Sequence, residues 1–182
     1  MKFRGQTIVL LIVVAVVIAT ISCASGYYMK EAFGSGSSLK TGVAIFKEPE
    51  VAGIVEITPE NGGVRIDATF NYLVGYHGFH IHKGGDLRGK GCEGLCDHFN
   101  IGPATNHGGP PGSLGPRHTG DLGNVTKGTF TYFLKGVKLD DLIGRSLVVH
   151  ADRDDLGKGG HSDSLTTGHS GARIACAIIG RA

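Results

Sequence analysis

Short apolar runs separated by glycine, proline, asparagine or aspartate dominate the chain from residue 43 onward. Many of them alternate apolar and polar residues, which is the period of a β-strand with one buried face. No long stretch in this part of the sequence shows the period of an amphipathic helix. The predicted strands are Val43–Phe46, Val51–Ile57, Val64–Tyr72, Gly78–His82, Gly128–Leu134, Ser146–His150 and Arg173–Ile179. This pattern predicts an all-β fold, a Greek-key antiparallel β-sandwich or flattened barrel.

Two long stretches interrupt the strand pattern, one from about Gly84 to Arg117 and one from Ala151 to Gly171. Loops of this length without secondary structure of their own are usually functional. The first stretch contains His98 and His107, so metal ligation can supply order that regular hydrogen bonding does not. We therefore expect two long functional loops on a rigid β-framework.

Six of the nine histidines and one aspartate have the spacing of metal ligands. His80 and His82 are two positions apart, so on a strand their imidazoles project from the same face. The other candidates are His98, His107, His118, Asp121 and His150. Imidazole suits copper and zinc, whereas three imidazoles with one carboxylate suit tetrahedral zinc. The seven residues therefore predict two unlike metal sites.

Residues 1–25 differ from the rest of the chain. Lys2 and Arg4 precede an uncharged apolar run, and the small residues at Ser22 and Ala24 suit cleavage after Ala24. The same run is long enough to cross a bilayer, which takes about 20 residues. Signal peptide and membrane anchor through residues 8–24 are both open, and lipid attachment at Cys23 is a third reading. Either of the first two predicts export, as a secreted protein or anchored with the domain on the non-cytoplasmic side.

Residues 26–40 are rich in glycine and serine and predict a flexible linker. Residues 41–182 then form one domain of ordinary size. The chain has 18 Lys and Arg against 16 Asp and Glu, and Lys2 and Arg4 account for the excess. The domain therefore lacks the basic surplus typical of nucleic-acid binding.

Roughly from Thr41 to Ala182, the chain resembles the copper/zinc superoxide dismutase family. The matching segments, in the family's order, are Gly78–His82, His98–Asn100, His107–Pro110, Arg117–Val125, Leu147–His150, Asp154–Gly160 and Gly171–Cys176. The resemblance implies an immunoglobulin-like β-sandwich. It implies copper bound by His80, His82, His98 and His150, and zinc bound by His98, His107, His118 and Asp121.

The activity that the resemblance implies is disproportionation of superoxide to dioxygen and hydrogen peroxide, by alternate reduction and oxidation of the copper, in antioxidant defence. His98 would bridge the two metals and carry a proton, and Arg173 would dock the superoxide anion. Asp154 would link His80 to His107 and fix their tautomers. A copper-delivery or other non-catalytic metal-binding module of the same fold is the alternative function.

The resemblance also implies a disulfide between Cys92 and Cys176. Cys96 departs from the family pattern and is open to three interpretations: a buried inert thiol, which we favour, an intermolecular link, or a rival partner for Cys176. The family often dimerises through an apolar patch, to which Ile143–Arg145 and Ile178–Gly180 correspond, so a homodimer is expected. Arg181 stands where an apolar residue is frequent.

Overall fold

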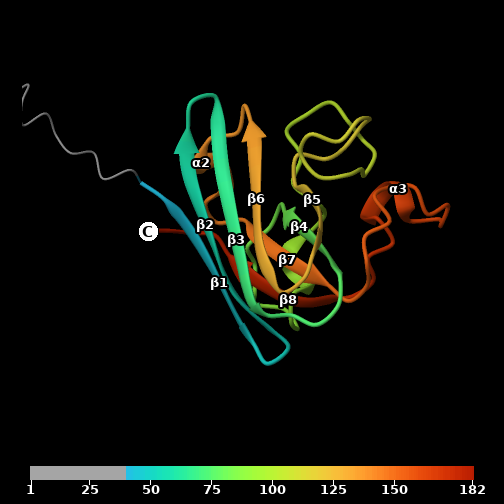
Figure 1. Ribbon diagram of the computed structural model, residues 1–182, viewed down its shortest axis with the longest axis horizontal. Helices are drawn as coiled ribbons and strands as arrows, with labels where there is room; N and C mark the ends of the chain where they lie inside the picture. Colours follow the sequence, from blue (N-terminus) through green and yellow to red (C-terminus); the bar gives the residue numbers. More distant parts are fainter. Residues whose placement is uncertain (1–39) are drawn as a thin grey trace, which may run out of the picture. The chain divides into compact units, whose positions relative to one another are not determined.

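A computed structural model describes residues 40–182, which form two antiparallel β-sheets packed face to face (Figure 1). The first sheet has the order β6-β3-β2-β1-β9 and the second the order β5-β4-β7-β8. The first is built from β1 (Gly42–Glu48), β2 (Val51–Glu60), β3 (Gly63–Tyr72), β6 (Gly128–Lys135) and β9 (Gly180–Arg181). The second is built from β4 (His77–His82), β5 (Asp121–Val125), β7 (Ser146–His150) and β8 (Arg173–Ile178). The chain crosses between sheets repeatedly, which confirms the predicted Greek-key β-sandwich.

The hydrophobic core lies between the sheets. Three aromatic rings meet there, with ring centroids 5.6 Å apart for Phe46 and Phe70 and 5.5 Å apart for Phe70 and Phe79. Phe79 belongs to β4, and successive side chains of a strand point to opposite faces. Burying Phe79 in the core therefore turns its neighbour His80, and with it His82, toward the outer face of the second sheet.

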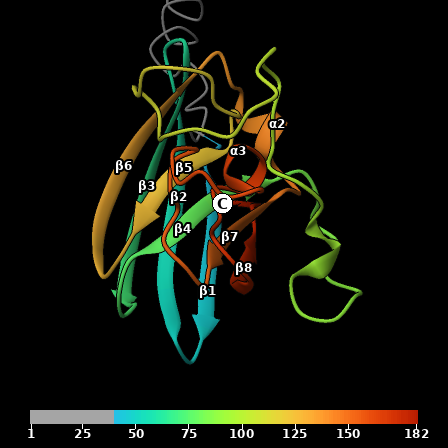
Figure 2. The same cartoon turned by 90° about the vertical axis from the view of Figure 1, so that its right-hand side faces the viewer.

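The two predicted long loops cover that outer face. The first joins β4 to β5 and contains the 3₁₀-helix η1 (Glu93–Leu95), and the second joins β7 to β8 and contains the short helix α3 (Ser164–Thr167). In the turned view of Figure 2, the loop carrying α3 lies in front of β4, β5 and β7. This cover explains why both faces of β4 are buried from Gly78 to His82.

All seven predicted strands are present, but two strands were missed. β5 contains the turn-forming residues Asp121 and Asn124 and a glycine in the left-handed region, Gly123, so its sequence lacks the alternating pattern. β9 has only two residues and pairs with β1. The short helix α2 (Leu139–Leu142) was also not predicted, because one helical turn leaves no period in the sequence.

The predictions for residues 1–25, and for the linker up to residue 39, lie outside the described residues. None of the helices within residues 40–182 has the length and apolar character that crossing a bilayer requires.

Candidate metal centre

Strand pairing and one β-bridge bring together histidines that are far apart in the sequence. His80 and His82 lie on β4, which pairs with β7, and β7 ends at His150. An isolated antiparallel bridge joins His82 to His98 and draws the first loop onto the outer face of β4. The backbone N–H of Phe99 donates to the carbonyl of Ile81 at 2.7 Å and fixes this position.

The first group of potential ligands is the all-histidine set His80, His82, His98 and His150, each of which offers a nitrogen within 4.8 Å of the others. Nε2 of His82 lies 3.4 Å from Nε2 of His150. Their Nδ1 atoms instead contact the carbonyls of Cys96 at 2.9 Å and Gly171 at 3.2 Å. These carbonyls accept a hydrogen bond from Nδ1–H, which leaves each Nε2 with a free lone pair facing the centre of the group.

The second group combines three histidines with one carboxylate. Asp121 Oδ1 lies 2.8 Å from Nδ1 of His98, 3.0 Å from Nδ1 of His107 and 3.4 Å from Nδ1 of His118. Asp121 Oδ2 accepts from the backbone N–H groups of Gly108 and His118, at 3.0 and 2.7 Å. One oxygen is thus held by the loop, and the other faces the three imidazoles.

Three buried nitrogens in these groups have no hydrogen-bond partner among residues 40–182: His80 Nδ1, His98 Nε2 and His118 Nδ1. A buried polar atom without a partner costs free energy, so these three nitrogens are suited to binding a metal ion. The two groups suit different metals, since four imidazoles suit copper and three imidazoles with a carboxylate suit tetrahedral zinc. The residues present therefore fit a copper ion beside a zinc ion.

His98 belongs to both groups. Its Nδ1 faces Asp121 in the second group, while its Nε2 is the unpartnered atom that it offers to the first. A single imidazole thus separates the two candidate metal positions.

Asp154 connects the two groups from behind. Its Oδ2 lies 3.0 Å from Nε2 of His80 and its Oδ1 lies 2.8 Å from Nε2 of His107, and all three side chains are buried. These contacts place the ring protons on Nε2 and leave both Nδ1 atoms free for metal. The predicted link between His80 and His107 is therefore present in the geometry.

Sequence reasoning missed Asn124, which holds Asp154 in place. Its side-chain amide donates to the carbonyl of Asp154 at 2.8 Å, and its side-chain oxygen accepts from the backbone N–H of Asp154 at 2.8 Å. Asn124 lies three residues after Asp121 on β5 and is only partly buried, so its role is visible only from these two hydrogen bonds. Gly168 was also not predicted from the sequence. An added Cβ at this position would overlap both Asp154 and His107.

Burial shifts the ionisation of the ligands in the metal-free chain. Desolvation and the neighbouring imidazoles lower the pKa of His80 and His82 well below the usual range, and desolvation lowers that of His150 to about 4. Desolvation acts on His107 too, but its hydrogen bonds to Asp121 and Asp154 outweigh it and raise the pKa to about 9. The first group is thus held in the neutral form that binds metals, whereas His107 must release a proton.

A cavity of about 760 Å³ opens onto the first group and is lined by His82, His98, His150 and Arg173. Arg173 donates from Nη1 to the carbonyl of Cys92 at 2.8 Å and from Nη2 to that of Cys96 at 2.6 Å. These two bonds hold the guanidinium at the wall of the cavity. A fixed cation at the mouth of a ligand site is suited to binding a small anion.

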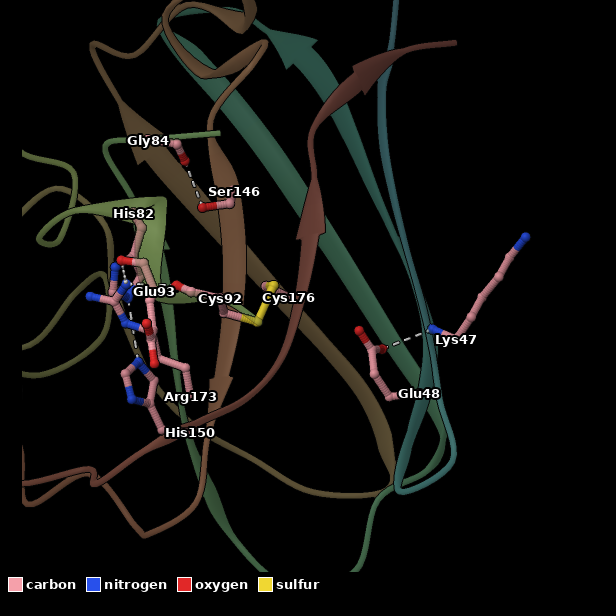
Figure 3. Close-up of a disulfide and its surroundings, with 10 residues drawn as sticks. All are labelled: Lys47, Glu48, His82, Gly84, Cys92, Glu93, Ser146, His150, Arg173 and Cys176. Atoms are coloured by element: carbon pink, nitrogen blue, oxygen red, sulfur yellow. Dashed lines mark hydrogen bonds between the residues drawn. A yellow bond between two sulfur atoms is a disulfide. The ribbon is translucent and has the colours of Figure 1, made fainter. Parts of the chain in front are cut away.

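The disulfide between Cys92 and Cys176 has a Cα–Cα distance of 6.0 Å and spans 84 positions. It ties the first loop to β8, the strand that also carries Arg173. Figure 3 shows Arg173 with His82 and His150 to one side of the disulfide. The bond thereby fixes the carbonyls that hold Arg173.

The favoured interpretation of Cys96 as a buried thiol is wrong, because Cys96 is exposed, and within residues 40–182 it forms no disulfide. Since Cys176 pairs with Cys92, Cys96 is not its partner. Its side chain points outward where the backbone turns into the left-handed region at φ 59°, while its carbonyl faces inward and accepts from Arg173. The backbone of Cys96 is thus part of the site although its thiol is not.

The remaining histidines lie outside the ligand groups of the described chain. His77 contacts the carbonyls of Val74 and His150, at 2.7 and 2.8 Å. His161 and His169 are exposed and stack with ring centroids 3.7 Å apart. None of these three histidines is part of a potential metal site in the described residues.

A Greek-key β-sandwich with one imidazole shared between two buried ligand groups defines a class of protein, the metalloproteins with a two-metal centre. Within this class the chain belongs to the copper/zinc superoxide dismutase family, whose sequence profile matches residues 51–179. It is 43% identical over 150 residues to a Cu-Zn superoxide dismutase of Paramecium bursaria Chlorella virus 1, covering 77% of this chain and 78% of the viral protein. It is also 51% identical over 112 residues to the copper chaperone for superoxide dismutase of Rattus norvegicus, covering 59% of this chain and 39% of the chaperone.

Proposed function

We propose that the protein is an enzyme that disproportionates superoxide to dioxygen and hydrogen peroxide. Copper would be held by His80, His82, His98 and His150, and zinc by His98, His107, His118 and Asp121. The observation that carries the proposal is the shared imidazole of His98, whose unpartnered Nε2 belongs to a ligand group that opens onto a solvent-accessible cavity.

Copper when bound supplies reversible one-electron chemistry, which zinc and protein side chains do not. Arg173 binds the superoxide anion through its guanidinium at the cavity wall. When Nε2 of His98 is not bound to copper, this nitrogen would take up a proton and would then supply it to the reduced substrate. The carbonyls of Cys92 and Cys96 keep Arg173 at the wall throughout.

The rat chaperone relative favours a second candidate, a copper-delivery module. The two functions make different demands on the cavity. Delivery requires that copper be released to a partner, whereas catalysis requires that an anion reach retained copper. The buried ligand set, held from behind by Asp154, favours retention.

The decisive experiment is superoxide disproportionation by the full-length protein after reconstitution with copper and zinc, followed by pulse radiolysis. We expect fast copper-dependent activity that is lost in His80→Ala. The control is His161→Ala, which removes an exposed imidazole from the second loop and should retain activity. Full occupancy by both metals without activity would refute the enzyme and favour the delivery module.

We also propose a homodimer and export. The expected contact segments lie together, since Gly144 N–H donates to the Ile179 carbonyl and Ile179 N–H to the Arg145 carbonyl, both at 2.9 Å. Arg181 is exposed beside them and pairs with Asp140. Light scattering of the purified protein tests the dimer, and N-terminal sequencing after expression tests cleavage after Ala24 against a retained anchor in residues 8–24.

A further inference from the structure

Two cations and two carboxylates line the cavity in addition to the histidines. The cations are Lys83 and Arg173, and the carboxylates are Asp97 and Asp163. Opposite charges at the mouth of a cavity cancel at long range but act separately on an ion that has entered. The pairing of these four groups therefore determines which of them an incoming anion meets.

Two of the four groups, Arg173 and Asp163, are engaged with other partners. Arg173 donates to the backbone carbonyls of Cys92 and Cys96, and Asp163 accepts from Nδ1 of His169 at 2.7 Å. Asp97 and Lys83 form an ion pair, but their separation of 3.4 Å is long for a charge-assisted hydrogen bond, and their side chains are 89% and 48% exposed. Such an exposed pair contributes little energy and is exchanged readily.

The backbones of Lys83 and Asp97 are nevertheless held in place. The N–H of Lys83 donates to the carbonyl of Asp97 at 2.9 Å, and the carbonyl of Lys83 accepts from Nη1 of Arg145 at 2.9 Å. Lys83 directly follows His82 and Asp97 directly precedes His98. The backbone therefore holds Lys83 beside the copper-side ligands, while its ammonium is about half exposed and can exchange Asp97 for another anion.

We infer that Lys83 is a second anion-binding residue at the cavity mouth and that Asp97 is a built-in carboxylate competitor for it. An entering anion displaces the Asp97 carboxylate from Lys83 and then passes to Arg173. No covalent bond changes in this step. The inference rests on the proposed function insofar as the anion is superoxide, but the docking itself applies to any small monovalent anion.

The test uses the copper- and zinc-loaded full-length protein and azide as the probe anion. Azide affinity is read from the visible absorption of the copper, independently of activity. We expect Lys83→Gln to weaken azide binding about threefold at low ionic strength and Asp97→Asn to strengthen it by a similar factor. Both differences should shrink at about 0.5 M salt, where the Debye length is only a few ångströms. Lys47→Gln is the control, since it removes the same charge from β1, on the other sheet.

The superoxide rate constant of the same variants should change in the same directions. Unchanged azide affinity in both Lys83→Gln and Asp97→Asn, or equal losses in Lys83→Gln and Lys47→Gln, would overturn the inference. If the unaltered protein has no activity while Lys83→Gln still weakens azide binding, the proposed enzyme fails and the docking role stands. Circular dichroism of each variant identifies any loss that comes from misfolding.

Discussion

Asp154 Oδ1 lies 2.8 Å from Nε2 of His107, although the two residues are 47 positions apart in the chain. The contact fixes the ring proton of His107 away from the proposed zinc. Asp154→Ala should therefore weaken zinc binding, by about 10- to 100-fold. Competition with a chromophoric chelator measures the affinity. The control Asp152→Ala removes a neighbouring carboxylate that is absent from the ligand groups of the described residues; equal losses in the two variants would contradict the role of Asp154.

Gly168→Ala should disrupt the same contact between Asp154 and His107 by steric overlap. Gly168 has φ +68°, and an added Cβ would overlap the carboxylate of Asp154 and the ring of His107. Gly160→Ala is a matched control in the same loop, because Gly160 has φ +77° but no atom of the described residues lies within 4 Å of the added Cβ. The control shares the backbone cost of about 1 kcal/mol, so only Gly168→Ala should also lose zinc affinity. Zinc analysis after dialysis compares the two variants.

Cys92→Ser should destabilise the protein by about 4.5 kcal/mol in the chain-entropy description of a loop of this length. It should also loosen the carbonyls that hold Arg173. We expect a lower melting temperature together with weaker azide binding in the metal-loaded protein. The contrasting variant is Cys96→Ser. Its exposed thiol has no disulfide partner within residues 40–182, so its replacement should leave the melting temperature and the azide affinity nearly unchanged. A large effect of Cys96→Ser would mean that the thiol has a role of its own.

The metal-free protein should be most stable near pH 6.5. The pKa of His150 falls from 6.5 to about 4 on folding, so the unfolded chain binds more protons between these values and stability decreases as the pH falls. The lowered pKa of His80 and His82 acts in the same direction. The pKa of His107 rises from 6.5 to about 9 on folding. Its contribution to the free energy of unfolding is therefore fully present below pH 6.5 and is lost as the pH rises through 9.

Melting temperatures from pH 4 to 9 after removal of both metals test this profile. His150→Gln should flatten the acidic side and leave the alkaline side unchanged. A profile that rises steadily from pH 6.5 to 9 would contradict the role given to His107.

Much of the fold was predictable because its signals are local. The alternation in Val51–Ile57 and Val64–Tyr72 depends only on neighbouring residues in the strand and indicated β2 and β3 correctly. β5 has no such signal, because its buried face carries Asp121, whose environment is supplied by distant loops. A buried polar residue in a strand can be explained only when its interaction partners are known.

The family and its ligand pattern could be identified from the sequence because residue types and their order are written there, and imidazole and carboxylate have intrinsic metal preferences. The Cys92–Cys176 pairing was likewise implied by the family resemblance. Only the tertiary structure decided that the thiol of Cys96 is exposed while its carbonyl holds Arg173, that Asn124 holds Asp154, and that Lys83 and Asp97 meet at the cavity mouth. These relationships depend on distances between segments far apart in the chain, which packing determines and no local pattern records.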